Sequence, residues 1–195
     1  MVKRKVLVVD VETGGLDPAI NAILSVGALV FHQGAIEDRF YSIVNEGDPQ
    51  QGGGKVDPEA LKVNGFTHTR IQGEGRSPVE VVNAIEAMLA KNDMRGRITI
   101  VAHNAAFDMG FMKRLWARAG KDFNKRFSYR ALCTQTGALL LEQAGRLQLP
   151  GGSASLDSLT KLWGINLDRG DGLHNALDDA EACALVLKRQ LEMLR

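Results

Sequence analysis

Three segments of the chain place acidic side chains where they could hold a divalent metal ion. Asp10-Val11-Glu12 follows an apolar run, Asp108 closes the segment His103-Asn104-Ala105-Ala106-Phe107-Asp108, and Asp179 follows His174. Carboxylate oxygens are hard ligands that suit Mg²⁺ or Mn²⁺, and a neutral histidine can accept a proton near pH 7. Together the three segments supply what metal-assisted hydrolysis of a phosphodiester requires.

The setting of Asp10 and Glu12 distinguishes them from other Asp-x-Glu tripeptides in the chain. They follow the apolar residues Val6-Leu7-Val8-Val9, which predict a strand, and side chains two apart on a strand point to the same face. Two neighbouring buried carboxylates repel each other unless a cation or a proton compensates them. A plainer explanation is that the strand ends at Asp10 and water hydrates both acids.

The other two segments each have an ordinary structural explanation when they are taken alone. Asp108 would lie in the first turn of a helix, where an acid complements the partial positive charge of the helix end. His174 would lie at the start of the last helix, where a surface or capping histidine is common. The combination of the three segments is what favours a catalytic metal site.

Hydrophobic periodicity and turn residues predict the strands and helices that carry these residues. The predicted strands are Lys5–Val11, Ala22–Phe31 and Ile36–Asn45 as an antiparallel meander, then Ile98–His103 and a short strand around Tyr129–Cys133. The predicted helices are Asp57 to about Gly65, Pro78–Ala90, Ala106–Ala119, Thr134–Gly145, Ser155–Trp163 and Asn175–Leu194. Gly47–Lys55 lacks the spacing of a P-loop and is assigned to a flexible loop. The order of elements predicts an α/β fold with a mixed sheet covered by helices.

The last predicted helix carries two adjacent acids, of which only one can face the sheet. Its apolar stripe consists of Ala176, Ala180, Cys183, Leu187, Leu191 and Leu194. Because successive residues turn by about 100°, Asp178 falls roughly opposite this stripe and Asp179 about 80° from its centre. Asp179 is expected to lean into the site and Asp178 to be solvated. Alternatively, both acids only complement the helix end.

Length and composition narrow the class of protein. A chain of 195 residues fits a single domain, residues 1–195. Its net charge of +1 is too small to indicate a protein that binds nucleic acid non-specifically through its overall positive charge. No apolar run approaches the roughly 18 residues of a membrane span, and no signal peptide is present. We therefore expect a soluble, cytoplasmic protein without a membrane partner. Cys133 and Cys183 give neither a disulfide framework nor a zinc spacing, and both thiols are expected to be buried.

In order and in spacing, the three segments resemble the motifs of the DEDDh exonucleases. This family contains the proofreading epsilon subunit of bacterial DNA polymerase III, ribonuclease T and oligoribonuclease. Asp-x-Glu-Thr-Gly stands at residues 10–14, His-Asn-x-x-Phe-Asp at 103–108 and His-x-Ala-x-x-Asp at 174–179. Ser155-Leu156-Asp157-Ser158-Leu159 is also similar to the epsilon subunit. The resemblance spans nearly the whole chain and implies a ribonuclease-H-like fold with a five-stranded mixed sheet.

The resemblance also implies roles for individual residues. Two Mg²⁺ or Mn²⁺ ions would be held by Asp10, Glu12, Asp108 and Asp179, and His174 would take the proton from the attacking water. The reaction would release nucleoside 5′-monophosphates one at a time from the 3′ end of single-stranded nucleic acid. Contacts to this 3′ end are expected from Thr13, Gly14, Leu16, Glu59, His103, Asn104 and Phe107. Leu16 or Phe107 could stack on a base, or either could instead belong to the core. For Phe107 the two interpretations have about equal weight.

The choice of substrate is less sharply defined. Ribonuclease T is similar at Pro58-Glu59-Ala60-Leu61, but it wedges bases with phenylalanines where this chain has Leu16 and Val63. An enzyme directed at DNA, or one of mixed specificity, is therefore favoured, with ribonuclease-T-like trimming of RNA 3′ ends as the alternative. A module that binds 3′ ends without cutting is a third hypothesis, against which the five metal and base groups argue. The sequence leaves open a homodimer or a polymerase partner.

Overall fold

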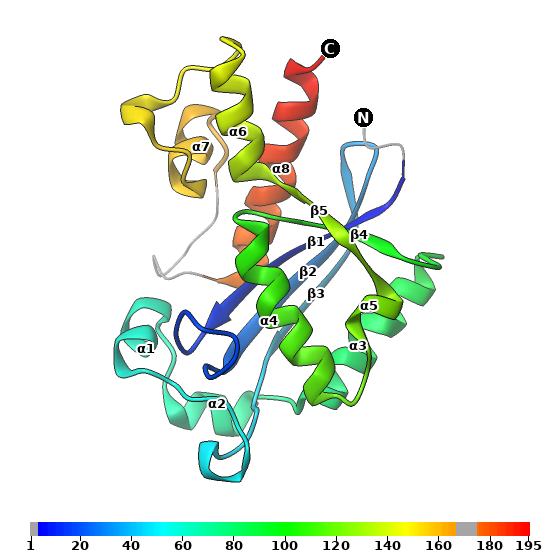
Figure 1. Ribbon diagram of the computed structural model, residues 1–195, viewed down its shortest axis with the longest axis vertical. Coiled ribbons are helices and arrows are strands. Elements are labelled where there is room, and N and C mark those ends of the chain that lie inside the picture. Colours follow the sequence, from blue (N-terminus) through cyan, green and yellow to red (C-terminus); the bar gives the residue numbers. More distant parts are fainter. Residues whose placement is uncertain (1–3, 167–174) are drawn as a thin grey trace.

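Five strands within the described residues form one mixed sheet at the centre of the molecule (Figure 1). The computed structural model describes residues 4–166 and 175–195. The strands are β1 (Val6–Thr13), β2 (Ile23–His32), β3 (Ala35–Ile43), β4 (Ile98–Ala102) and β5 (Phe127–Cys133). Their order is β3-β2-β1-β4-β5, with β1 antiparallel to β2, β2 antiparallel to β3, and β4 parallel to both β1 and β5. The expected α/β class, mixed sheet and antiparallel meander are confirmed.

The first strand is longer than predicted. Its ladder with β2 continues past Val11, because Glu12 pairs with Ser25 and, after an irregularity, Thr13 pairs with Ile23. Asp10 and Glu12 therefore lie inside a strand that runs to Thr13. The explanation that the strand ends at Asp10 and leaves both acids in water is wrong.

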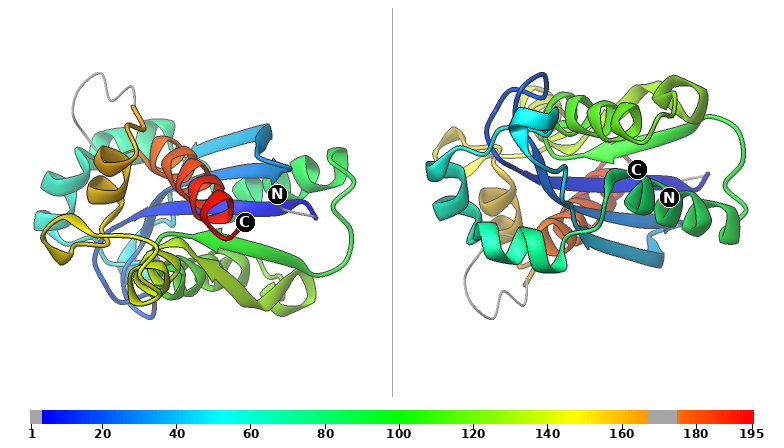
Figure 2. Two further views of the ribbon diagram at one scale, coloured as in Figure 1. Left: turned by 90° about the horizontal axis from the view of Figure 1, so that it is seen from above. Right: turned by 90° about the horizontal axis from the view of Figure 1, so that it is seen from below.

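Helices cover both faces of the sheet (Figures 1 and 2). They are α1 (Pro58–Asn64), α2 (His68–Glu74), α3 (Pro78–Lys91), α4 (Ala105–Arg118), α5 (Phe123–Arg126), α6 (Thr134–Gln143), α7 (Leu156–Leu162) and α8 (Ala176–Met193), with 3-10 turns η1 (Pro49–Gln51) and η2 (Pro150–Gly152). The sequence did not predict α2 and α5. Each is short and capped by the residue before it, since Thr67 accepts the N–H of Arg70 and Asp122 accepts the N–H of Asn124. None of the helices in the described ranges has the length and apolar character to cross a membrane.

The alternation of side chains along β1 divides the hydrophobic core into two layers. Leu7, Val9 and Val11 pack in a cluster with residues of α3 and α4, whereas Val6 and Val8 pack with residues of α8 on the opposite face. Figure 2 shows α8 and α4 on opposite sides of the sheet. Because strand side chains alternate with period two, Asp10 and Glu12 share the α8 face with Val6 and Val8.

The glycine-rich segment at residues 47–55 is tethered and is not the free loop that was expected. Ala22 donates its N–H to the carbonyl of Lys55, and Lys55 donates its own to the carbonyl of Ile20, both at 2.8 Å. The guanidinium of Arg118 donates to the carbonyl of Gly52. The end of this segment is therefore hydrogen-bonded to the residues that connect β1 to β2.

The two cysteines differ in exposure. Cys183 is buried on α8, as predicted, but Cys133 is half-buried. Cys133 ends the edge strand β5, which has a neighbour on one side only, and its Sγ caps α6 by accepting the N–H of Thr136. The expectation of two buried thiols therefore holds for Cys183 alone.

Candidate active site

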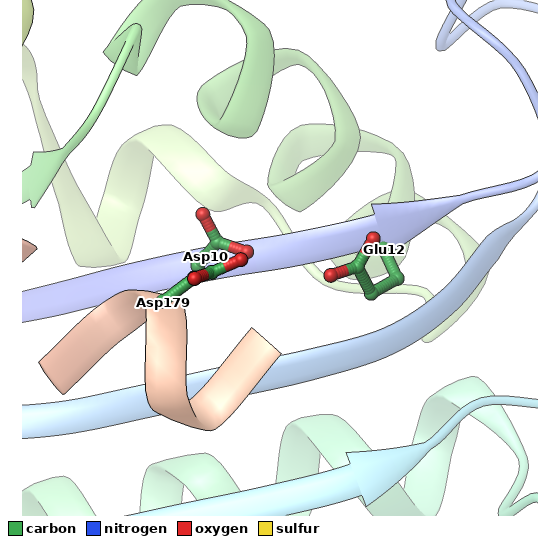
Figure 3. Close-up of side chains that lie close together, drawn as sticks. All are labelled: Asp10, Glu12 and Asp179. Carbon is green, nitrogen blue, oxygen red and sulfur yellow. The ribbon is translucent and has the colours of Figure 1, made fainter. Parts of the chain in front are cut away.

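Three of the four predicted acids meet between β1 and the start of α8 (Figure 3). Asp10, Glu12 and Asp179 each offer one carboxylate oxygen, and these oxygens lie within 4.8 Å of one another. Glu12 and Asp179 are only 8% and 5% exposed. Asp10 is half-buried. Holding three acids this close together, two of them buried, is costly unless cations or protons compensate their charge. The cluster offers only carboxylate oxygens, so its residues fit a hard divalent cation such as Mg²⁺ or Mn²⁺.

A glycine opposite Asp10 allows α8 to come this close to the sheet. Gly27 is the antiparallel partner of Asp10. A Cβ on Gly27 would lie 2.2 Å from the carbonyl oxygen of Ala176 and 2.5 Å from the nitrogen of Leu177. These are backbone atoms at the start of α8, so the helix itself would have to move. Gly27 was not predicted as a site residue, although a lone glycine inside an apolar strand is the signal of such a close approach.

The two adjacent acids of α8 differ in their surroundings. The side chain of Asn175 accepts the N–H of Leu177 at 2.9 Å, which starts the helix at Ala176. Asp179 is buried and joins the acid cluster, as its position at the edge of the stripe predicts. Asp178 is half-buried, so the prediction that it is solvated was wrong.

The buried face of α8 is also wider than the predicted stripe. Val186 and Gln190 are buried in addition to the apolar residues that were expected. Leu194 lies beyond the end of the helix and is 60% exposed. The helix packs against the sheet and against α6 and α7, so more than one narrow stripe is covered.

Asp108 lies in the first turn of α4, beside the cluster of three acids. It is 2% exposed, and its Oδ2 has no hydrogen-bond partner among the described residues. Burial raises the pKa of Asp108 to about 8, and the electrostatic effects of Cys133 and Glu12 also raise it, against the backbone N–H groups of Asp108 and Val11. A buried carboxylate oxygen without a donor fits a site completed by a cation. Asp108 therefore fits the role of a fourth ligand, although it is not one of the three mutually close acids.

The junction between β4 and α4 carries the other predicted residues of the second segment. The Nδ1 of His103 lies 2.9 Å from the hydroxyl of Thr134, and burial lowers the pKa of this half-buried histidine, against the opposing effects of the Ala154 backbone and Asp179. Asn104 is exposed, and its φ of 66° turns the chain from strand to helix. Phe107 is half-buried, with its ring centroid 5.0 Å from that of Phe111, and so belongs partly to the core.

The turn after β1, residues 14–21, is held by hydrogen bonds to neighbouring segments. Gly14 donates its N–H to the carbonyl of Ala22 at 2.8 Å and accepts the N–H of Asp57 at 2.7 Å. The side chain of Asn64, on α1, donates to the carbonyl of Thr13 at 3.0 Å. A Cβ on Gly14 would lie 2.7 Å from the carbonyl oxygen of Lys55, so glycine is required for this close approach.

The predicted contact residues Leu16 and Glu59 are exposed around this turn. Leu16 lies in the turn between the hydrogen-bonded residues Gly14 and Asp17, and its side chain is 84% exposed. Glu59 lies in the first turn of α1 and pairs with Lys62 at 2.7 Å. Both residues are accessible to a ligand. His174 lies outside the described residues, and its role as a general base stays a prediction.

The comparisons with known proteins agree with this geometry. The model of the exonuclease family RNase_T matches residues 7–187. The chain belongs to this exonuclease family. The resemblance to the DEDDh exonucleases is thereby confirmed, and this exonuclease has the ribonuclease-H-like fold that the resemblance implied.

Relatives and solved structures show how far the similarity extends. A PolC-type DNA polymerase III of Thermotoga petrophila is 30% identical over 189 residues, which are 97% of this chain and 12% of that protein. The exonuclease thus spans only a small part of the polymerase that it matches. Escherichia coli exonuclease I in complex with a dT13 oligonucleotide has a TM-score of 0.73 at 19% identity, covering 97% of this chain and 42% of that one. The nuclease domain of 3′hExo, a DEDDh family member bound to rAMP, has a TM-score of 0.73 at 13% identity, covering 96% and 92%.

Proposed function

We propose that this exonuclease releases nucleoside 5′-monophosphates from the 3′ end of single-stranded nucleic acid, DNA in preference to RNA, and requires Mg²⁺ or Mn²⁺. The acid cluster carries the proposal. Oxygens of Asp10, Glu12 and Asp179 lie within 4.8 Å of one another, and the buried carboxyl group of Asp108 interacts electrostatically with Glu12. The fold shared with exonuclease I, whose structure contains a dT13 oligonucleotide, supports a single-stranded DNA substrate.

Each acid would contribute from a different place in the fold. Asp10 and Glu12 would bind cations from the sheet, Asp179 from α8 and Asp108 from α4. The chemistry that two bound divalent ions supply is stabilisation of charge on the entering and leaving oxygens of the phosphate. His174 would hold the proton of the attacking water, since an ordinary histidine is mostly neutral at pH 7.

The turn after β1 would receive the 3′-terminal nucleoside. It begins two residues after Glu12, and neighbouring segments hold the backbone at its start, at Thr13 and Gly14. Leu16 offers an exposed apolar side chain on which a base can stack, whereas Phe107 is half-buried against Phe111. We therefore assign stacking to Leu16.

Two alternative functions are weaker on the same observations. Ribonuclease-T-like trimming of RNA would use phenylalanine wedges, but two of those places are taken by Leu16 and Val63, which are 84% and 63% exposed. A module that only binds 3′ ends would have no need of a costly buried cluster of acids. The match to a PolC-type polymerase supports a polymerase as partner, whereas a homodimer stays a prediction.

Degradation of matched 5′-labelled single-stranded DNA and RNA tests the proposal. With Mg²⁺ we expect faster shortening of DNA than of RNA, and no shortening in excess EDTA. Faster degradation of RNA would favour the ribonuclease-T-like alternative. Undiminished cleavage in excess chelator would contradict the metal assignment, and binding without cleavage would favour the binding module.

A further inference from the structure

We propose that Arg114 is a positioning residue that holds the turn after β1 in place for the 3′-terminal nucleotide. The inference rests on the proposed function, which assigns this turn to the substrate. It concerns a buried ion pair that lies outside the three motifs. Arg114 would not touch the reacting atoms but would act through the backbone of residues 17–21.

The guanidinium of Arg114 joins α4 to two loops. Its Nε and NH2 donate to the carboxylate of Glu46 at 3.0 and 2.7 Å. Its NH1 donates to the carbonyl oxygens of Pro18 and Ala19, both at 3.3 Å. A planar guanidinium with five N–H donors can serve a carboxylate and two carbonyls at once, which the compact ammonium of lysine cannot do with the same geometry.

The ion pair of Arg114 and Glu46 is largely buried, which restrains both side chains. The side chains of Arg114 and Glu46 are 14% and 1% exposed. Glu46 also accepts the N–H of Ile23, where β2 begins, at 3.0 Å, and Arg118 donates to its backbone carbonyl at 2.8 Å. A charge buried to this extent must stay paired, because an isolated one is strongly destabilising. The pair therefore links α4, the start of β2 and the segment that contains Glu46.

The two carbonyls that Arg114 holds belong to the turn that presents Leu16. The N–H groups of Ile20 and Asn21 donate to the carbonyl of Asp17 at 3.1 and 2.7 Å, which closes this turn on itself. The turn also packs on α4, since a Cβ on Gly110 would lie 3.0 Å from the ring of Pro18. Arg114 thus secures the side of the turn that faces α4.

The acids do not depend on Arg114 for their positions. Asp108 lies in the first turn of α4, and that helix is anchored by the buried side chains of Phe111, Met112, Leu115 and Trp116. Asp10, Glu12 and Asp179 are held by β1 and α8. Loss of Arg114 should therefore displace the turn and leave the acid cluster intact.

A second pair in the chain provides a matched control. The Nε of Arg126 donates to Glu86 at 2.7 Å, and its NH1 and NH2 donate to the carbonyls of Gly96 and Met94 at 3.2 and 2.9 Å. The two side chains are 19% and 27% exposed. This pair lies near the starts of β4 and β5, whereas the candidate site lies where β4 ends.

Two double variants compare the pairs directly: Arg114→Met with Glu46→Gln, and Arg126→Met with Glu86→Gln. Each removes a charge pair and two carbonyl contacts without leaving one charge buried alone, and Glu46→Gln keeps an acceptor for the N–H of Ile23. Glu46→Gln also removes the longer ion pair with Arg118 at 3.9 Å, but Arg118 is 32% exposed and keeps its hydrogen bonds to the carbonyls of Glu46 and Gly52. We expect a rise in KM for single-stranded DNA of about tenfold for the Arg114 pair only, with kcat and the half-saturating Mg²⁺ concentration within about threefold of wild type. If the first double variant fails to fold, Arg114→Lys keeps the charge beside Glu46 and should raise KM in the same direction.

The outcomes separate this role from the proposed function. An active wild-type enzyme with the same KM in both double variants would overturn the positioning role and leave the exonuclease function intact. A fall in kcat with unchanged KM would also overturn it. A wild-type protein without activity on any single strand would refute the proposed function first.

Discussion

Asp178 and Asp179 are neighbours on α8, but only Asp179 belongs to the acid cluster of the described residues. We expect Asp179→Asn to lower kcat by about 10³-fold, the order of several kcal/mol that metal-ion catalysis contributes. The matched change Asp178→Asn should leave kcat within about threefold, since it removes no member of the cluster. Steady-state rates at saturating Mg²⁺, with melting temperatures for both variants, make the comparison. The reverse order of damage would overturn the assignment.

The buried carboxyl of Asp108 should make the stability of the metal-free protein depend on pH. Its folded pKa of about 8 lies above the ordinary value, because burial disfavours the charged form. A group with a raised folded pKa contributes its full stability below the unfolded pKa of about 3.9, and this contribution is lost as the pH rises toward 8. In EDTA the free energy of unfolding should therefore fall over this window, with about 1.4 kcal/mol per pH unit as the limiting slope for one proton.

Denaturant titrations at several pH values measure this effect, with Asp108→Asn as the control. The amide of that variant cannot ionise, so its stability should change less between pH 4 and 8. Equal slopes for the two proteins would mean that Asp108 is already ionised when no metal is bound.

His174 is expected to be the general base that takes a proton from the attacking water. His174→Ala is expected to lower kcat by about 10² to 10⁴, the usual contribution of a general base. Binding of a single strand, measured by fluorescence anisotropy in Ca²⁺, should remain close to wild type. Near-wild-type turnover of this variant would move the base role to another group.

At the level of the elements, the close approach of α8 to β2 depends on Gly27. Gly27→Ala would place a methyl group against the backbone of Ala176 and Leu177, so the start of α8 and with it Asp179 would have to move. We expect a loss of stability of about 1 to 3 kcal/mol, as for other overpacked sites, and at least about a tenfold fall in kcat. Chemical denaturation and steady-state rates measure the two effects.

Gly73→Ala is the matched control for Gly27→Ala. Gly73 lies in α2, and a Cβ there has no neighbour within 4 Å. Alanine should stabilise this helical position slightly, by up to about 1 kcal/mol, and leave kcat unchanged. Equal activity of the two variants would show that α8 does not depend on Gly27.

The sequence predicted elements best where periodicity is long. The helix of α8 and the strand of β2 were predicted nearly at their observed bounds, because each carries a sustained apolar pattern. In contrast, α2 and α5 are a few residues long, and their caps compete with turn signals of the same residue types. The end of β1 was misplaced because its pairing with Ser25 and Ile23 of β2 is a tertiary contact.

The positions of Asp10, Glu12 and Asp179 were predictable from local geometry, but the residues that support them were not. Period two along β1 placed Asp10 and Glu12 on one face, and the helical turn distinguished Asp179 from Asp178. Gly27 and the pair of Glu46 with Arg114 form contacts between segments far apart in sequence. The glycine inside β2 signals that another segment comes close but does not say which one, and no pattern within a single segment indicates the pairing of Glu46 with Arg114.

The acids of the candidate site come together because two helices, α4 and α8, pack on opposite faces of the central strand β1. β1 lies inside the sheet, α8 covers one face and α4 the other, and the acids gather where α4 begins and β1 approaches its end (Figures 1 and 2). The turn after β1, secured by Arg114, lies next to them in sequence. The turn proposed to receive the terminal nucleotide therefore directly follows the strand that carries two of the proposed metal ligands.

Attack from a free 3′ end can be tested by comparing linear with circular single-stranded DNA, because the circle has no 3′ end. Both substrates have the same sequence and are incubated with Mg²⁺, and the linear strand carries a 5′ label. We predict a ladder of labelled products that shorten one nucleotide at a time from the 3′ end, release of nucleoside 5′-monophosphates, and an intact circle. Cleavage of the circle would show endonuclease activity, and release of the labelled 5′ nucleotide as the first product would show attack from the 5′ end. Either result would rule out attack from the 3′ end.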